Sequence, residues 1–157
     1  MKPYTIHIDI GLPRQQVVEL FENQENLFAW QTGLEDVQHV SGILGREGAQ
    51  SLLVFNHGSH RIELKETLTH VDLPELIEGL YEWDGGQNTL SNRFVELGSD
   101  STRLQCVCHY QFSKLAMKLM GFLMPGTFKK QHMKFLQNFK AFCESGHSVT
   151  DFVQRKK

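Results

Sequence analysis

The sequence carries almost no net charge and has no long hydrophobic run. Its 16 Lys and Arg residues stand against 18 Asp and Glu residues, which gives a formal net charge of −2. Proteins that bind nucleic acid usually show a basic surplus, so we expect no nucleic-acid partner. The most apolar stretch, Leu115–Met124, is too short to span a bilayer and contains Lys118. We therefore expect no transmembrane segment.

Cysteine is also scarce, with 3 residues in 157. Cys106 and Cys108 lie two positions apart in a segment that alternates like a β-strand, which is poor geometry for a disulfide. Reduced thiols fit a cytoplasmic protein, in which buried cysteines act as small apolar residues. The N-terminal segment alternates, with Ile6, Ile8 and Ile10 at every second position, and forms no continuous apolar run. We therefore expect no signal peptide and a cytoplasmic location.

Motifs for several common catalytic chemistries are missing. The chain shows no Ser/His/Asp order, no glycine-rich phosphate loop and no metal-ligand spacing. His57 and His60 flank a turn, but no third ligand lies near them in the sequence, so they fall short of a zinc site. We predict neither a bound metal nor a cofactor.

What the sequence does contain is the pattern of one α+β domain. At 157 residues, 40% of them hydrophobic, the chain is long enough to bury a core. Tyr4–Ile10 reads as a half-buried strand, and two short helices follow it, the first opening at Pro13 and the second ending at Trp30. Between residues 34 and 113, turn residues recur about every eight to twelve positions, which is typical of antiparallel hairpins.

A long amphipathic helix follows the strands. Pro125-Gly126 separates a Met- and Leu-rich piece, Leu115–Met124, from a longer piece that begins with Thr127 as its N-cap. The longer piece ends at Ser145, before Gly146. Four aromatic residues share one stripe of this helix: Phe128, Phe135, Phe139 and Phe142. So bulky a stripe must be covered by a wide apolar surface, and the strands are the candidate.

Two predicted turns assign the faces of the sheet. A two-residue turn at Gly58-Ser59 pairs His57 with His60 and, further along, Ser51 with Glu66. The same ladder places Phe55 opposite Ile62 and Leu53 opposite Leu64 on one face. A turn at Gly85-Gly86 predicts three more pairs on that face: Tyr81 with Leu90, Gly79 with Asn92, and Ile77 with Phe94.

In the last strand, the alternation of apolar and polar residues predicts which side chains form the inner face: Leu104, Cys106, Cys108, Tyr110 and Phe112. Phe94 shares that face only if the loop around Ser99–Ser101 has an odd length of about three or five residues, because a one-residue slip reverses every side chain.

Several landmarks carry a family resemblance: Ile8-Asp9-Ile10 before Leu12-Pro13, Trp30, Asn92-Arg93-Phe94, Ser101-Thr102-Arg103-Leu104 and Asn138-Phe139-Lys140-Ala141-Phe142. With the order of elements, they resemble the START/Bet v 1-like superfamily, in its polyketide cyclase/dehydrase-like (SRPBCC) branch, over roughly residues 4–145. The resemblance implies a helix-grip fold: a seven-stranded curved antiparallel sheet wrapped around the C-terminal helix, with two short helices between strands 1 and 2. It also implies a cavity for lipids, sterols, polyketides or other apolar molecules. We predict this domain over residues 1–145 and a polar tail over residues 146–157.

The facing surfaces of sheet and helix give a candidate ligand-binding site. Its members are Phe55, Leu64, Tyr81, Asn92, Phe94, Cys108 and Tyr110 from the sheet, with Met120 and Phe135 from the C-terminal segment. Such residues can equally fill a core. A strongly bent sheet over one helix is hard to fill at interior density, however, and this favours a cavity.

Glu66 is the strongest polar candidate for a catalytic residue. Among apolar groups its carboxylate would have a raised pKa suited to acid/base work, whereas at the rim or beside a partner it would not. Asn92 opposite Gly79 has room for a ligand beside it, or is a satisfied core amide. Tyr110 can offer its hydroxyl to a bound polar group. His132 lies between Phe128 and Phe135 on the C-terminal helix and either points into the cavity or, as we expect, is partly buried without a function.

Three functions follow from this pattern. The first is a cytoplasmic protein that binds a hydrophobic small molecule in an internal cavity. The second is a cyclase/dehydratase-type enzyme acting on an apolar carbonyl substrate, with Glu66 as acid/base and Tyr110 or Asn92 polarising the carbonyl. The third is a protein-interaction module. In any of them, the Met117–Met124 segment is either the roof of the cavity or a patch that makes transient contact with a membrane.

Overall fold

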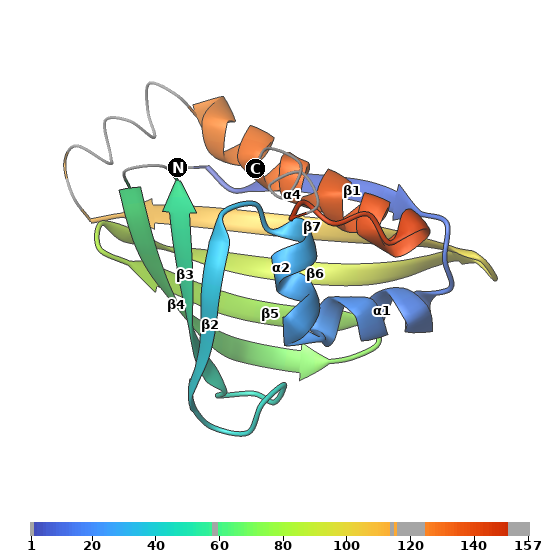
Figure 1. The fold of residues 1–157 in the computed structure, drawn as a ribbon, viewed down its shortest axis with the longest axis horizontal. Coiled ribbons are helices and arrows are strands. Elements are labelled where there is room, and N and C mark those ends of the chain that lie inside the picture. The colour runs from blue at the N-terminus through green and yellow to red at the C-terminus, as the bar shows by residue number, and fades with distance from the viewer. Residues whose placement is uncertain (1, 58–59, 114, 116–124, 151–157) are drawn as a thin grey trace.

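One antiparallel sheet of seven strands forms most of the molecule, in the order β1-β7-β6-β5-β4-β3-β2. The computed structural model describes residues 2–57, 60–113, 115 and 125–150 (Figure 1). Its elements are β1 (Tyr4–Ile10), α1 (Arg14–Glu22), the 3₁₀ turn η1 (Gln24–Asn26), α2 (Leu27–Trp30), β2 (Leu34–Ser41), β3 (Gln50–His57), β4 (His60–Asp72), β5 (Leu76–Trp83), β6 (Gly86–Gly98), β7 (Ser101–Phe112) and α4 (Pro125–Ser145).

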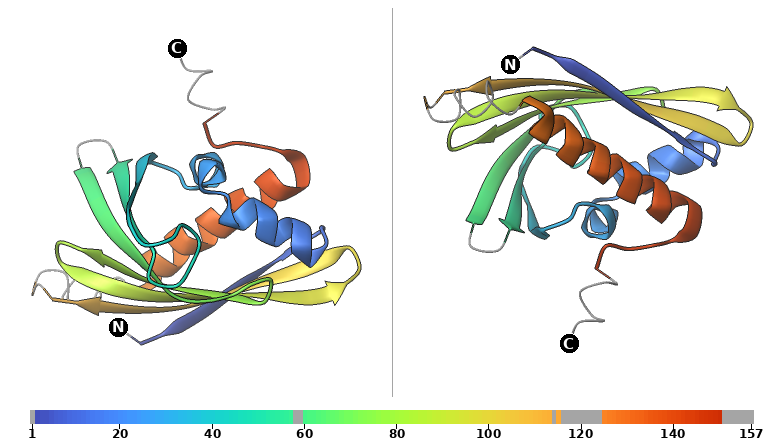
Figure 2. Two further views of the ribbon diagram at one scale, coloured as in Figure 1. Left: turned by 90° about the horizontal axis from the view of Figure 1, so that it is seen from below. Right: turned by 90° about the horizontal axis from the view of Figure 1, so that it is seen from above.

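The sheet is curved, and α1, α2 and α4 lie on its concave side (Figure 2). Alternation along the strands produces this arrangement, because every second residue faces the helices. In β7, for example, Leu104, Cys106 and Cys108 are fully buried while Val107 between them is exposed. The predicted helix-grip α+β fold, with its inner face of β7, is confirmed.

One end of the concave side is solidly packed. Phe139 of α4 is fully buried and contacts Trp30 of α2 at 5.1 Å and Phe21 of α1 at 5.5 Å between ring centroids. Phe21 in turn meets Phe94 of β6 edge to face at 5.2 Å. Asn138 then donates hydrogen bonds of 3.1 Å to the Trp30 carbonyl and to the Thr32 hydroxyl. These contacts fix the second half of α4 against the short helices.

Helix α4 ends where the sequence predicts and begins earlier. Gly146 follows Ser145 with a φ of 68°, and its N–H donates to the Phe142 carbonyl at 2.8 Å. The predicted N-cap at Thr127 is wrong, because the helix already starts at Pro125. Proline is well tolerated in the first turn, where its missing N–H removes no helical hydrogen bond. Beyond the helix, Val149 N–H donates to the Ala29 carbonyl at 2.8 Å.

The β3–β4 register is as predicted, from His57 opposite His60 to Ser51 opposite Glu66. The β5–β6 register is not. The turn residues are Asp84-Gly85, Trp83 pairs with Gly86, and the predicted pairs are displaced by two residues. A Cβ on Gly86 would lie 2.4 Å from the Gln111 carbonyl oxygen, so this glycine belongs in the strand where β7 comes close.

A shift of two residues leaves every side chain on its predicted face but changes its partners. Gly79 pairs with Leu90, Tyr81 with Asn88, and Ile77 with Asn92. Phe94 pairs with Leu104 on the inner face, as the alternation predicts. The loop before β7 does not have the predicted odd length. The loop is the two residues between Gly98 and Ser101, and a bulge after Glu96 supplies the extra residue.

Candidate functional site

A large cavity lies between the concave face of the sheet and α4, and its volume is about 1780 Å³. Phe128, His132 and Phe135 of α4 line one side, and residues of β3 to β6 line the other. Typical ligand pockets measure about 300–1,000 Å³, so this space exceeds what loose packing alone would leave. Helix α4 contacts the short helices and β7, and the cavity lies between α4 and strands β3 to β6.

A row of polar side chains crosses the concave face, and Glu66, Tyr81, Asn88 and Tyr110 of this row line the cavity. Its members are direct cross-strand partners on five adjacent strands: Ser51, Glu66, Tyr81, Asn88 and Tyr110. We call them the polar row. The neighbouring row on one side is Leu68, Gly79, Leu90, Cys108 and Tyr4. The row on the other side includes Leu53 and Leu64, then Trp83, Gly86 and Phe112. A polar strip therefore runs between walls that are mainly apolar.

Glu66 and Tyr81 are the ionisable pair of the polar row. The Tyr81 hydroxyl hydrogen-bonds to the Glu66 carboxylate, which lowers the pKa of the carboxyl group. Burial acts in the opposite direction and is larger, so the pKa of Glu66 is raised above its ordinary value. Burial and the Glu66 charge also raise the pKa of Tyr81 well above its ordinary value. The raised pKa has the direction that an acid/base needs, and the catalytic role of Glu66 stays a prediction.

Asn92 differs from its predicted setting. It is buried opposite Ile77, and its Oδ1 accepts a hydrogen bond from the Cys106 thiol at 2.9 Å. The space expected above Gly79 is filled, since a Cβ there would lie 3.1 Å from the Tyr81 ring. Asn92 therefore matches the alternative of a satisfied amide at the cavity wall.

Aromatic rings gather at the opposite end of the polar row. Tyr110 stacks on Tyr4 at 6.2 Å and lies 4.8 Å from Phe128 of α4. Burial raises the pKa of Tyr110 to about 12, so it stays a neutral hydroxyl. The Tyr4 hydroxyl is buried beside Tyr110 and Cys108 without a well-formed hydrogen bond to any described residue. Cys108 Sγ lies 2.9 Å from Nδ1 of His132.

The structure brings most of the predicted site residues to one cavity. Its lining includes Phe55, Leu64, Tyr81, Asn92, Tyr110 and Phe135. Phe94 and Cys108 are fully buried and do not contribute to the lining. Phe94 belongs to the solid core around Phe21, and Cys108 lies behind the wall, so we no longer propose either as a direct ligand contact. Met120 and the Met117–Met124 segment lie outside the described residues.

Asn88 and His132 line the cavity but are not among the predicted ligand-binding residues. Asn88 was hidden by the displaced β5–β6 register, which assigned Leu90 to Tyr81. His132 was noted on the inner side of the helix, but nothing in the sequence shows that α4 crosses β7 at Cys108. Ser51 was already paired with Glu66, although the row that this pair begins became visible only with the correct register.

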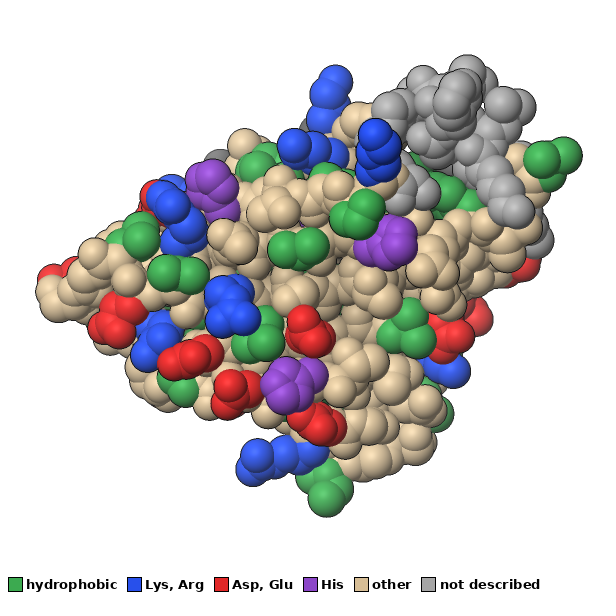
Figure 3. Space-filling view, turned by 180° about the vertical axis from the view of Figure 1, so that it is seen from behind, with side chains coloured by type: hydrophobic (Ala, Val, Ile, Leu, Met, Phe, Trp, Pro, Cys, Tyr) green, Lys and Arg blue, Asp and Glu red, His purple; other side chains and the backbone are tan. Residues whose placement is uncertain are grey.

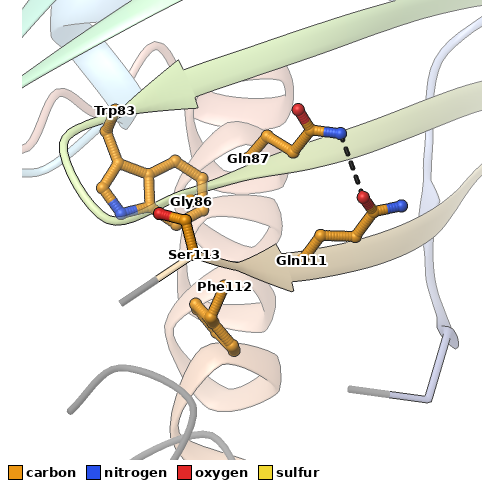
Figure 4. Close-up of a pocket in the computed structure, with 6 residues that line it drawn as sticks. All are labelled: Trp83, Gly86, Gln87, Gln111, Phe112 and Ser113. Atoms are coloured by element: carbon orange, nitrogen blue, oxygen red, sulfur yellow. Dashed lines mark hydrogen bonds between the residues drawn. The ribbon is translucent and has the colours of Figure 1, made fainter. Parts of the chain in front are cut away.

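A second, smaller pocket of about 310 Å³ lies near the β5–β6 turn (Figure 4). Trp83, Gly86, Phe112 and Ser113 line it, and Gln87 donates a hydrogen bond of 3.1 Å to Gln111 across it. Its lining contains no titratable group. The face shown in Figure 3 displays acidic and basic side chains interspersed with single apolar ones, which is ordinary solvated surface. The large cavity is therefore the better candidate site.

Two further observations bear on predicted absences. Within residues 2–57, 60–113, 115 and 125–150, no group of three or more His, Cys, Asp and Glu side chains is arranged to hold a metal ion. Among the same residues, no helix is long and apolar enough to cross a membrane.

Comparison with known proteins gives the fold. No protein-family model matches the sequence, and no curated protein matches it. Among solved structures, the Zhui aromatase/cyclase from Streptomyces sp. R1128 matches with a TM-score of 0.77 at 10% identity, covering 94% of this chain and 99% of that chain. A START superfamily protein from Mycobacterium smegmatis matches with a TM-score of 0.68 at 14% identity, covering 85% and 93%.

Norcoclaurine synthase from Thalictrum flavum, solved with dopamine and hydroxybenzaldehyde, matches with a TM-score of 0.68 at 16% identity, covering 90% of this chain and 85% of that chain. At these identities the likeness shows the fold alone. The chain has the helix-grip fold of the START/Bet v 1-like superfamily, as its sequence landmarks predict.

Proposed function

We propose that this protein binds an apolar small molecule that carries polar substituents in the cavity between the sheet and α4. The observation that supports this proposal most is a space of about 1780 Å³ whose lining is mainly apolar and includes Glu66, Tyr81, Asn88 and Tyr110 of the polar row. Apolar walls favour transfer of a hydrophobic molecule from water by about 25 cal/mol per Å² buried. A few fixed polar groups then orient that molecule.

The fold supports the same proposal. The structural neighbours include a START superfamily protein and an enzyme solved with two ring-bearing molecules, dopamine and hydroxybenzaldehyde. In this chain the aromatic side chains Phe55, Tyr81, Tyr110, Phe128 and Phe135 line the cavity. A planar ligand can stack closely on these aromatic side chains. We therefore expect a planar or ring-containing ligand to bind better than a flexible chain.

Titration of the purified protein with fatty acids, sterols, quinones and flavonoids tests the proposal, using intrinsic fluorescence and calorimetry. A matched pair of variants locates the binding. Leu90→Trp places a bulky side chain in the cavity, whereas Val107→Trp places it on the exposed face of the neighbouring strand β7. We expect binding by wild type and Val107→Trp and at least a roughly tenfold loss in Leu90→Trp. Equal binding by both variants would place the ligand elsewhere.

A second candidate function is enzymatic, and the setting of Glu66 favours it. A half-buried carboxyl group with a raised pKa beside a tyrosine hydroxyl is suited to move a proton to and from a carbonyl compound. In this mechanism ionised Glu66 takes the proton from the carbon next to a carbonyl, which leaves an enolate. Tyr110 donates a hydrogen bond to the oxygen, and Glu66 returns the proton in cyclisation or dehydration.

Deuterium exchange tests this second function without knowledge of the substrate. 1-Tetralone in D₂O would exchange the hydrogens next to its carbonyl faster with the protein than without it, as measured by mass spectrometry. Glu66→Gln should remove the acceleration and leave binding of 1-tetralone unchanged. Exchange that is equally fast with Glu66→Gln would eliminate Glu66 as the base and leave the binding function as the better account.

The third possibility, a protein-interaction module, receives less support. We expected a collapsed interior for such a protein, and the large cavity does not fit that expectation. The Met117–Met124 patch that would serve it lies outside the described residues.

A further inference from the structure

His132 of α4 contacts a buried cysteine of the sheet through one of its ring nitrogens. Its Nδ1 lies 2.9 Å from Cys108 Sγ, and Cys108 is fully buried. Burial raises the pKa of the Cys108 thiol to about 12 and lowers the pKa of the His132 imidazole to about 4. Both groups are therefore neutral near pH 7. In the tautomer on which the inference rests, the thiol donates its proton to Nδ1.

A neutral imidazole has one acceptor nitrogen and one donor nitrogen. Because Nδ1 accepts the thiol proton, Nε2 carries the N–H. The ring edge of His132 also packs against Tyr4, with 6.4 Å between centroids and 69° between planes, which further limits rotation. His132 lines the cavity, and Cys108 is its one hydrogen-bond partner among the described residues. The Nε2–H group is thus a fixed donor with a cavity beside it.

We propose that His132 receives the carbonyl oxygen of the ligand through Nε2–H, with Cys108 as the positioning residue for the ring. This inference rests on the proposed function and makes it more specific, because the ligand must then be an apolar molecule with a carbonyl acceptor. Glu66 belongs to the β4 wall of the same cavity, whereas His132 belongs to α4. A ligand that spans the cavity is therefore held at its carbonyl end by the helix, and its other polar groups face the polar row.

The test compares 9-fluorenone with fluorene, two rigid tricyclic molecules that differ in the carbonyl group. The measured quantity is the ratio of their dissociation constants, obtained by calorimetry or fluorescence. In His132→Phe, which keeps a ring but removes the donor, we expect the preference for 9-fluorenone to fall about tenfold relative to wild type. His132→Gln keeps an N–H donor and an acceptor for the thiol, so it should retain most of the preference.

A second readout reports the hydrogen bond directly. The C=O stretching band of bound 9-fluorenone should lie at lower wavenumber in wild type and His132→Gln than in His132→Phe. Cys108 is tested in parallel. Cys108→Ser keeps a donor to Nδ1 and should preserve the preference for the ketone, whereas Cys108→Val removes that donor and should weaken it while fluorene still binds as tightly as to wild type.

Failure of the His132 inference and failure of the proposed binding function give different results. If both probes bind but His132→Phe leaves their ratio unchanged, or the C=O band of the wild-type complex is unshifted, the His132 inference is wrong and the binding function stands. If neither probe binds to wild type, both fail. Should His132→Phe not fold, as judged by circular dichroism, the C=O band in wild type still decides.

Discussion

At the scale of single residues, His132 makes a prediction about acid stability. Its pKa falls from the usual 6.5 to about 4 because the imidazole is buried. Between these pH values the unfolded chain binds a proton that the folded protein does not, so the free energy of unfolding decreases as the pH falls. Over the whole window the loss is on the order of 3 kcal/mol. Urea unfolding at a series of pH values from 7 to 4 measures it.

The matched variant is His132→Gln, which has no titrating group at this position. Its free energy of unfolding should vary less steeply with pH over the same window. A pH dependence identical to that of wild type would show that His132 does not stay neutral in the folded protein.

Glu66 makes a prediction of the opposite sign. Its pKa is raised in the folded protein by burial, so the folded state binds the proton more strongly than the unfolded state. Glu66 therefore costs stability as the pH rises above its ordinary value of 4.5. Glu66→Gln should melt at a higher temperature than wild type at pH 7, and the difference should disappear below pH 4.5.

The control for this substitution is Glu63→Gln on the same strand. Glu63 is exposed and pairs with Arg61 at 3.0 Å, so losing its charge should not raise the melting temperature. If both variants melt at or below the wild-type temperature at pH 7, the Glu66 carboxyl is not destabilised by its surroundings.

At the scale of elements, α4 has two different halves. The sequence predicts that Phe139 anchors the fold while residues nearer the start of the C-terminal segment serve the ligand, with Met120 as the example. Met120 lies outside the described residues, but Phe135, one turn before Phe139, takes its place in the comparison. Phe139 is fully buried among aromatic rings, whereas Phe135 is half-buried and faces Phe55 at 6.4 Å beside the cavity.

Alanine substitution at these two positions separates anchoring from binding. Phe139→Ala should lower the free energy of unfolding by roughly 3–5 kcal/mol, because a filled core loses a whole ring. Phe135→Ala should cost less than half of that and weaken binding of an aromatic probe. Urea unfolding and probe titration measure the two effects. Equal losses of stability at the two positions would contradict the division of α4.

The hairpins show how far local sequence determines register. The β3–β4 pairing follows from its turn alone, and all four predicted pairs from His57–His60 to Ser51–Glu66 are correct. The β5–β6 turn contains two adjacent glycines, and local sequence does not choose between them. The choice is made by Gln111 of β7, whose carbonyl lies where a Cβ on Gly86 would be. A strand far along the chain thus decides the register.

The same distinction applies to the candidate site. Glu66 and Tyr81 were placed on the concave face by alternation, which is a local property of each strand. Their contact, and the row that continues to Asn88, depend on the register. The Cys108–His132 contact depends on where α4 crosses the sheet, and no short-range pattern encodes that position.

At the scale of the whole molecule, the concave side of the sheet is filled at one end and hollow at the other. Phe94, Phe139 and Trp30 form the filled end with α1 and α2, and Trp30 and Phe139 also border the cavity. The hollow end holds most of the polar row, the aromatic cluster around Tyr110 and the His132 ring. Packing at the filled end stabilises the fold. The side chains at the hollow end can therefore serve ligand binding. Domain limits at residue 145 and the cytoplasmic location stay predictions.

The central claim is that the hollow end holds an apolar molecule, and native mass spectrometry of the freshly purified protein tests it most directly. We predict a mass above that of the chain, an excess that is released on denaturation and that is absent from Leu90→Trp but present in Val107→Trp. A wild-type protein that appears at the bare chain mass, and remains there after incubation with fatty acids, sterols, quinones and flavonoids, would contradict the claim.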